Sequence, residues 1–295
     1  MQPLKPRLQT ILKQAGLHER LRSSFAYDLY WKIADPRRID RRNKEVGFYR
    51  SLLAGFGKGD LIFDIGANVG DKTDVFLKLG ARVLAVEPDQ ACQGILKEKF
   101  LRYRVTPKPV VIVGKAVSDT ITTKTMWIDG PTSALNTLSY KWVKTLKDDK
   151  QRFEYTRCKL DFVQQKEVET TTLDQLILAH GLPFFAKIDV EGYEFNALQG
   201  LHRPVPYVSF EVNLPEFRRE GIRCVQLLTR LAPDGRYNYA IDCQHGLLLQ
   251  RWAGAQYISR VLDECRERSV DVFWNSPACT GRSRRVMDEN RWAPE

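Results

Sequence analysis

The sequence predicts an α/β protein with a mostly parallel sheet that is covered by helices on both faces. Short apolar runs typical of buried strands alternate with helical segments from residue 61 to residue 274. Strands that alternate with helices form βαβ units, which place neighbouring strands parallel. The length of 295 residues and the hydrophobic content of 43% suit a large globular domain. No apolar run reaches the roughly 18 residues that a membrane-spanning helix needs, so no such helix is expected.

The first half of the sheet is predicted from three apolar runs. LIFDI is followed by a glycine-containing turn, and RVLAVE and VVIV come next along the chain. Helices are expected between them, and Gly80 follows the first helix, where a C-cap glycine is common. The expected strands are 61–65, 82–87 and one that begins at 110–113, and the expected helices are 72–79 and 90–100.

The second half continues the alternation with four further strands. The apolar runs FFAKIDV, YVSFEV, YNYAIDC and VDVFW are separated by segments with helical spacing. Gly181 and Gly200 each end a predicted helix, and a threonine begins the first of these as its N-cap. The expected strands are 184–190, 207–212, 237–243 and 270–274, and the expected helices are 170–181, 193–200, 215–231 and 257–268.

Two segments do not follow this alternation. Residues 4–56 have apolar side chains at helical spacing, which predicts helices. For residues 118–160, the sequence predicts short strands or a hairpin, together with a helix near 141–145. We expect this segment to be an insertion over the site. We therefore divide the chain into a basic helical arm (1–58), a main domain (59–278) and a C-terminal tail (279–295).

The positive charge is concentrated in the arm. Residues 1–58 hold 13 Lys and Arg against 5 Asp and Glu, which is +8 of the total net charge of +10. A solvated helix face explains such a run, and an anionic acceptor or transient contact with a membrane surface would use it. Nucleic acid is not expected, because no aromatic RNA-binding pattern accompanies the charge. The densest part contains Arg37, Arg38, Arg41, Arg42 and Lys44.

The cysteines and the N-terminus favour a cytoplasmic protein. The 6 cysteines are scattered and no two are spaced C-x-x-C, so a structural zinc site is not expected. Free thiols suit a reducing compartment. The first residues carry a lysine within their apolar part and no small-residue cleavage site, unlike a secretory signal.

The turn after the first strand carries the strongest chemical signal. The strand ends in Asp64, and Gly66 and Gly70 follow four residues apart, which is not the dinucleotide pattern G-x-G-x-x-G. Glycines allow the sharp turn and a close approach to a ligand. A carboxylate at the entrance would disfavour a pyrophosphate there. It would suit a cationic cofactor such as S-adenosylmethionine, which carries an ammonium and a sulfonium.

A second acidic residue lies one βαβ step further along the chain. Glu87 ends the next strand, 23 residues after Asp64, where a carboxylate can accept both hydroxyls of a ribose. NAD would use the same acid, so an NAD-linked oxidoreductase is an alternative on Glu87 alone. The combination of Asp64, the G-x-x-x-G turn and Glu87 favours S-adenosylmethionine.

These motifs resemble the FkbM family of class I S-adenosylmethionine-dependent methyltransferases. The resemblance covers roughly residues 60–275, and its specific part is the KIDVEG segment that follows DIGANVG in the chain. It implies a seven-stranded sheet, in the order 3-2-1-4-5-7-6, whose last strand is antiparallel. It also implies methyl transfer, usually to an oxygen of a small molecule or glycan. The residues that carry it are 64–73, 86–89, 115–119, 171–176, 187–200 and 210–213.

The resemblance also implies which residues bind the cofactor. The glycine turn would shape the pocket of the methionine part, Glu87 would hold the ribose, and the end of the third strand would lie near the adenine. Thr73 would cap the first helix or touch the cofactor. The full expected set is Asp64, Gly66, Ala67, Asn68, Gly70, Thr73, Glu87, Pro88, Ala116 and Val117.

An alcohol acceptor has to lose a proton during methyl transfer, so a general base is expected at the ends of later strands. Asp189 and Glu191 follow the fourth strand, Glu211 and Asn213 lie at the end of the fifth, and His245 follows the sixth. Residues two apart share a face while a strand persists, so these groups could converge on one opening. Asp189, Glu191, Glu211 and His245 are the catalytic candidates.

Two further alternatives remain open in the sequence. Asp189 with Glu211 or Asn213 loosely resembles the oxygen ligands of magnesium-dependent catechol methyltransferases, although we assign no metal. A non-catalytic binding module, brought to an anionic surface by the arm, is the alternative to an enzyme. The expected function is O-methylation of a hydroxyl on a sugar, glycan, glycolipid or secondary metabolite, and no motif identifies the acceptor.

Overall fold

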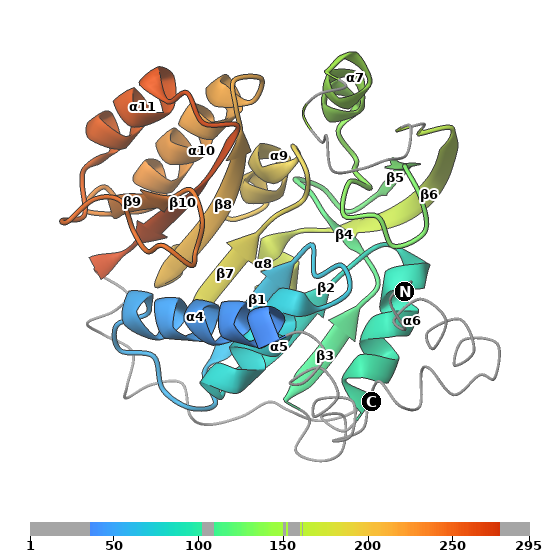
Figure 1. The fold of residues 1–295 in the computed structure, drawn as a ribbon, viewed down its shortest axis with the longest axis horizontal. Helices are drawn as coiled ribbons and strands as arrows, with labels where there is room; N and C mark the ends of the chain where they lie inside the picture. The colour runs from blue at the N-terminus through green and yellow to red at the C-terminus, as the bar shows by residue number, and fades with distance from the viewer. Residues whose placement is uncertain (1–35, 102–108, 150–151, 153–159, 161, 278–295) are drawn as a thin grey trace, which may run out of the picture.

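The computed structural model describes residues 36–101, 109–149, 152, 160 and 162–277. The helices expected from residue 4 to residue 35 and the tail at 279–295 lie outside the described residues. Within the described part, strands and helices alternate from β1 to β10, except that β3, β4 and β5 follow one another with no described helix between them (Figure 1). No helix of this part is both long and apolar enough to cross a membrane.

The main sheet has the predicted topology. Its seven strands run in the order β3-β2-β1-β7-β8-β10-β9, and β10 is antiparallel to both of its neighbours. All other pairings in this sheet are parallel, so both the expected order 3-2-1-4-5-7-6 and the single antiparallel strand are confirmed. The strands are β1 (Leu61–Ile65), β2 (Arg82–Val86), β3 (Val110–Val113), β7 (Phe185–Ile188), β8 (Tyr207–Asn213), β9 (Arg236–Ala240) and β10 (Ser269–Asn275).

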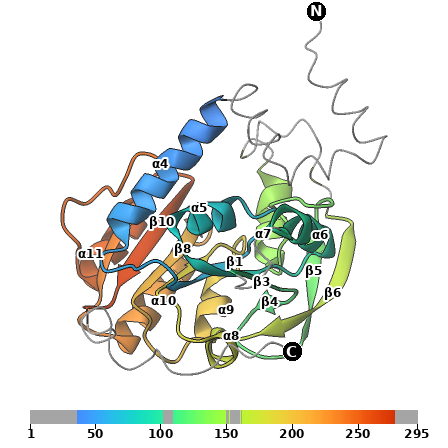
Figure 2. The same cartoon turned by 90° about the horizontal axis from the view of Figure 1, so that it is seen from below.

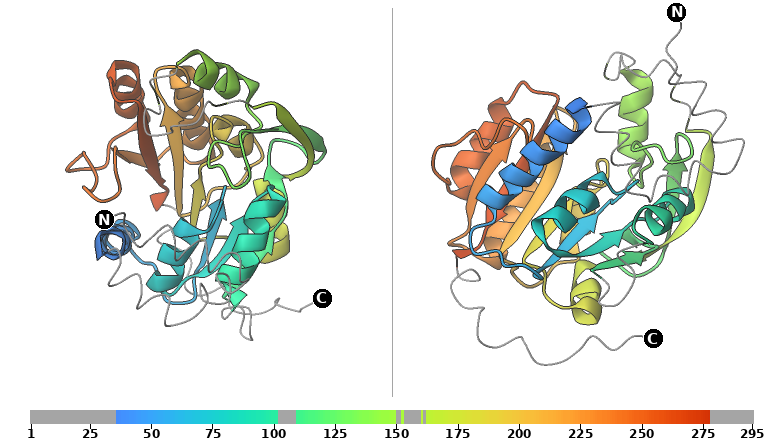
Figure 3. Two further views of the ribbon diagram at one scale, coloured as in Figure 1. Left: turned by 45° about the vertical axis from the view of Figure 1, so that its right-hand side comes forward. Right: turned by 60° about the horizontal axis from the view of Figure 1, so that its bottom comes forward.

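Helices cover both faces of this sheet (Figures 2 and 3). Successive residues of a strand point to opposite faces, so Ile62 packs with α4 and α5 whereas Phe63 packs with the helices of the other face. Because both faces are buried, the strands are apolar at nearly every position. The helices are α4 (Pro36–Leu52), α5 (Asp71–Leu79), α6 (Gln90–Lys99), α8 (Leu173–His180), α9 (Glu194–Gln199), α10 (Arg218–Leu231) and α11 (Ala255–Glu264).

Helix α4 is part of the body of the protein, although it belongs to the arm in the sequence-based division. Tyr49 is buried, and its ring packs edge-on against Phe76 at a centroid distance of 5.0 Å. Val46 and Leu52 are buried in the same cluster. Two ion pairs join α4 to α5: Arg42 to Asp74 at 2.7 Å and Lys72 to Glu45 at 2.9 Å.

The insertion between β3 and β7 forms a second sheet and a helix. Its strands are β4 (Ala116–Val117), β5 (Thr123–Ile128) and β6 (Gln164–Thr171), in the order β4-β6-β5, and its helix is α7 (Tyr140–Asp148). One strand of this sheet and the helix lie within the expected segment 118–160, whereas the other two strands lie outside it. Ala116 and Val117, which we expected at the end of the third strand, form one of these two strands. The predicted helix at 170–181 began too early, because Thr170 and Thr171 belong to β6. β-branched threonines favour strands, and Thr172 is the residue that caps α8.

Candidate functional site

The turn after β1 depends on glycine at its first position. Gly66 has a φ of +79°, and a Cβ there would collide with the carbonyl oxygen of Asp189. Only glycine combines this backbone conformation with so close an approach to the end of β7. Gly70 has the same φ, and a Cβ there would collide with the side chains of Phe100 and Leu96. The turn therefore lies directly against the carboxyl end of the neighbouring strand.

Asp64 lies behind this turn and not on a pocket wall. Its side chain is completely buried, and the Thr73 hydroxyl donates to Oδ2 at 2.6 Å. The Lys187 ammonium lies 3.9 Å from Oδ1, which has no hydrogen-bond partner among the described residues. Burial raises the pKa of the Asp64 carboxyl, and the positive charge of Lys187 opposes this. An unpaired acceptor in this position can receive a further donor.

Glu87 is held by two backbone donors at the end of β2. The amide of Asn68 donates to one carboxylate oxygen and the amide of Asp89 to the other, each at 2.8 Å. Burial raises the pKa of Glu87 to about 7, although both amides favour the ionised form. The remaining lone pairs of both oxygens can accept the two hydroxyls of a ribose.

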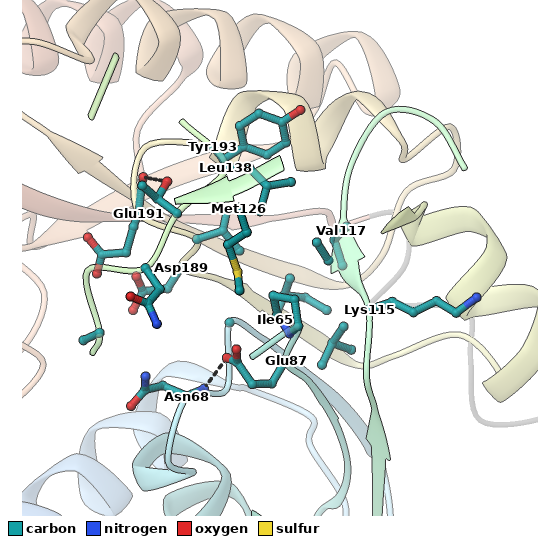
Figure 4. Close-up of a pocket in the computed structure, with 18 of the residues that line it drawn as sticks. Ile65, Asn68, Glu87, Lys115, Val117, Met126, Leu138, Asp189, Glu191 and Tyr193 are labelled. Atoms are coloured by element: carbon teal, nitrogen blue, oxygen red, sulfur yellow. Dashed lines mark hydrogen bonds between the residues drawn. The ribbon is translucent and has the colours of Figure 1, made fainter. Parts of the chain in front are cut away.

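A cavity opens above these strand ends (Figure 4). Glu87 and Asn68 lie on one side of it, and Glu191 and Tyr193 lie on the other. Six of the expected cofactor residues line it: Gly66, Asn68, Glu87, Pro88, Ala116 and Val117. Ala67, Gly70, Thr73 and Asp64 are buried and support the turn from behind.

The insertion supplies a wall that the sequence analysis could not assign. Met126 of β5 and the loop after it line the cavity together with Tyr193. Tyr193 belongs to the 187–200 segment, but Met126 and the loop belong to no recognisable motif, and nothing in the sequence places them over the strand ends. The loop residues on the wall are Ser133, Ala134, Asn136, Thr137 and Leu138.

Hydrogen bonds connect this loop to both cofactor motifs. The Asn68 side-chain amide donates to the carbonyls of Thr132 and Ser133, each at 3.4 Å. Asp89 accepts from the Thr132 amide and from the side chain of Asn136, each at 3.3 Å. Asp89 also caps α6. The loop is therefore anchored to the same residues that follow β1 and β2.

Three of the four catalytic candidates lie together. One oxygen each of Asp189, Glu191 and Glu211 lies within 4.8 Å of the other two. Burial, followed by the charge of Asp189, raises the pKa of both Glu191 and Glu211 well above its usual range. Such close carboxyls can share a proton, and their oxygens could also surround a cation. Lys187 partly neutralises the group through a 2.8 Å ion pair with Asp189.

His245 does not join this group. Its side chain is 82% exposed, and its ring nitrogen lies 3.4 Å from Asp242 in the turn after β9. β9 is the edge strand of the sheet, and β10 and β8 separate it from β7. Asn213 lies closer to the group, since its side chain donates to Glu211 at 3.3 Å.

These residues fit S-adenosylmethionine. Glu87 offers acceptors for a diol, and the unpaired oxygen of Asp64 lies behind the turn that would face a cationic group. Ala116 and Val117 provide an apolar wall for a flat ring system. A second ligand could reach the carboxylates of Asp189 and Glu191, which line the same cavity.

The chain matches a known protein family over more than half of its length. The model of the methyltransferase FkbM domain matches residues 64–231, which contain the turn, Glu87 and all three clustered carboxylates. No curated protein matches the chain significantly in sequence.

Several solved structures have a similar arrangement of elements. A methyltransferase FkbM from Methylobacillus flagellatus KT has a TM-score of 0.49 and 15% identity, and the match covers 78% of this chain and 47% of that one. The chain thus spans about half the length of that relative. An S-adenosylmethionine-dependent O-methyltransferase from Thermotoga maritima has a TM-score of 0.37 and 11% identity, and the match covers 79% of this chain and 64% of that one. A precorrin-6y C5,15-methyltransferase from Geobacter metallireducens has a TM-score of 0.36 and 9% identity, and the match covers 79% of this chain and 84% of that one.

Proposed function

The chain belongs to the FkbM family of S-adenosylmethionine-dependent methyltransferases, and from this premise we propose that it methylates a hydroxyl group of a sugar, glycan, glycolipid or secondary metabolite. The observation that carries the proposal is that Glu87, whose carboxylate can accept the hydroxyls of a ribose, lines the same cavity as Asp189 and Glu191. Membership of this family sets aside the NAD-linked alternative.

The residues of the β1 and β2 ends would hold the cofactor. Glu87 would accept the ribose hydroxyls, Gly66 and Asn68 would contact the methionine part, and Ala116 and Val117 would contact the adenine. Asp64 would act through charge from behind the turn, because it does not line the cavity. When bound, S-adenosylmethionine supplies a methyl group that its sulfonium already activates, so the protein mainly has to position the acceptor.

The carboxylates would remove the acceptor proton. As the acceptor oxygen forms its bond to the methyl carbon, its proton has to pass to a base within hydrogen-bond reach. Glu191 is our first choice because it lines the cavity and its pKa is raised toward the range where a carboxylate becomes a stronger base. Glu211 would share the proton, since it lies in the same group of oxygens.

The test uses labelled S-adenosylmethionine and a small-molecule extract that contains sugars and glycolipids. We expect the wild-type protein to transfer label to a component that gains one methyl group on oxygen, as identified by mass spectrometry. E191Q should bind S-adenosylhomocysteine normally and transfer at least 100-fold more slowly, which is the lower range for loss of a general base.

Other outcomes would change the assignment. Label on nitrogen or carbon would disprove O-methylation while leaving a methyltransferase. Tight binding of S-adenosylmethionine with no product in any extract would favour a binding module. Normal transfer by E191Q would remove Glu191 from the catalytic group.

A further inference from the structure

The backbone of Glu191 is held in an uncommon conformation. Its φ is +55°, which side-chain-bearing residues rarely adopt and which costs about 1 kcal/mol or more. The Thr137 hydroxyl of the insertion donates to its carbonyl at 2.7 Å. On either side, the amides of Val190 and Gly192 donate to Glu194. The position of Glu191 is thus determined by the insertion as well as by its own turn.

The Glu191 carboxylate also contacts the insertion. The indole Nε1–H of Trp142, in α7, donates to Oε2 at 3.0 Å. Trp142 is completely buried, so water does not compete for this bond at the indole. Other charged groups act on the same carboxylate: Asp189 and Lys187 from β7 and its end, Glu194 from α9, and Glu211 from β8.

Neighbouring side chains hold the indole of Trp142. The Arg152 guanidinium lies 4.9 Å from the ring centroid, and the ring of Phe217 packs edge-on at 5.7 Å. Arg152 in turn binds the carbonyls of Leu214 and Arg268 at 2.7 and 2.9 Å. These contacts connect α7 to the segment after β8, so the indole nitrogen has little freedom to leave Glu191.

We propose that Trp142 is a positioning residue that orients the Glu191 carboxylate for methyl transfer. The inference rests on the proposed function, in which Glu191 takes the acceptor proton. One oxygen of Glu191 is fixed by the indole, and the other is left to meet the acceptor. Trp142 does not line the cavity, so we expect no effect on cofactor binding from loss of its N–H.

The substitution W142F removes the donor and keeps an aromatic ring in the core. W274F is the matched control, because Trp274 is equally buried and its indole nitrogen has no hydrogen-bond partner among the described residues. Both variants lose indole packing, and W142F should lose more stability because it also loses the hydrogen bond to Glu191. W142F should transfer label to the extract at least tenfold more slowly at saturating labelled cofactor, with a Kd for S-adenosylhomocysteine within twofold of wild type. W274F should keep the wild-type rate.

A double-mutant cycle separates positioning from general packing. In the E191Q background, W142F should slow transfer less than twofold further, because the carboxylate it orients is gone. Full additivity of the two effects would overturn the inference. Normal transfer by W142F would also overturn it and leave the proposed function intact, whereas normal transfer by E191Q would end both the role of Glu191 and that of Trp142.

A spectroscopic measurement tests the contact without an acceptor. In ¹⁵N-labelled protein, the indole resonance that disappears in W142F belongs to Trp142. E191Q should shift this resonance upfield, because a hydrogen bond to a charged acceptor is stronger than one to a neutral amide. The control E264Q, at an exposed position of α11, should leave it in place. An unshifted indole in E191Q would overturn the inference.

Discussion

Single residues in the turn after β1 determine whether the cofactor cavity can form. Gly66 needs both its positive φ and the absence of a Cβ, since the Asp189 carbonyl occupies that space. We expect G66A to lower the free energy of unfolding by at least about 2 kcal/mol, because strain and collision add. It should also abolish S-adenosylmethionine binding. Denaturant unfolding and calorimetry measure the two effects.

The control for this substitution is G94A in α6. Gly94 is exposed, has nothing within 4 Å of a built Cβ and lies in a helix. Alanine there should stabilise the helix by up to about 1 kcal/mol and leave cofactor affinity unchanged. Equal losses in G66A and G94A would show that the close approach to Asp189 is not decisive.

Glu87 makes cofactor affinity depend on pH. Its pKa is raised to about 7 by burial, and only the ionised carboxylate can accept both ribose hydroxyls in addition to its two backbone donors. Affinity should therefore fall as the pH drops through 7, by about tenfold between pH 8 and pH 6. Calorimetric titrations with S-adenosylhomocysteine, which lacks the sulfonium charge, assign the effect to the ribose. A Kd that stays constant over this range, or an equally steep dependence in E87Q, would contradict the prediction.

At the scale of elements, the turn between β7 and α9 carries two of the catalytic candidates, Asp189 and Glu191, and is stabilised by Glu194. One oxygen of Glu194 accepts from the amides of Val190 and Gly192, and the side chain is buried. Burial raises the pKa of Glu194 from 4.5 to about 7. The native state therefore binds more protons than the unfolded state between these pH values, and this group's contribution to stability is lost as the pH rises through that window.

E194Q should remove this pH dependence. Glutamine keeps an oxygen that can accept both amides but does not titrate. As the pH rises from 5 to 8, the free energy of unfolding of E194Q should increase by about 1–3 kcal/mol relative to that of the wild type. Urea unfolding at several pH values measures it, with E264Q as the control. Parallel stability curves for E194Q and the wild type would show that Glu194 does not titrate in this range.

The elements differ in how far the sequence could predict them. β1, β2, β7 and β8 are buried on both faces, so their apolar runs identify them as strands, and the glycines after β1 and β7 identify the turns there. The strand order followed from family resemblance. The insertion was harder, because β6 is largely exposed and polar and carries no apolar run. Its position over the cavity comes from long-range contacts, such as those of Asn68 with the loop, which no local pattern encodes.

The same contrast applies to the site. Asp64 and Glu87 could be predicted because each lies at the end of a recognisable strand, one βαβ step apart. That Asp64 supports the turn and does not line the cavity depends on Thr73 and Lys187, which surround it only in the folded chain. His245 also follows a strand, but that strand is at the edge of the sheet. Distance across the sheet, and not position along the chain, separates it from the other candidates.

At the scale of the whole molecule, the division at residue 58 does not follow the packing. α4 buries Tyr49 against Phe76 and Phe185, at ring distances of 5.0 and 5.7 Å, and so covers part of the sheet. The basic sequence of the arm therefore continues into a helix that the core requires. A role of the arm in binding an anionic acceptor or membrane surface remains a proposal that has to be tested on the residues before α4.

Two truncations separate these roles. Deletion of residues 1–52 removes α4 and exposes the apolar face formed by Phe76 and Phe185, so we expect it to abolish cooperative unfolding and cause aggregation.

Deletion of residues 1–35 keeps α4 and its ion pairs with α5. It should retain the melting temperature within about 3 °C and the wild-type Kd for S-adenosylhomocysteine. Because it removes a net positive charge, it should weaken binding to vesicles that contain anionic lipid, and this loss should be smaller at high salt. Unchanged vesicle binding would assign the charge of those residues to solvation alone, and a folded 53–295 fragment would show that α4 is dispensable for the core.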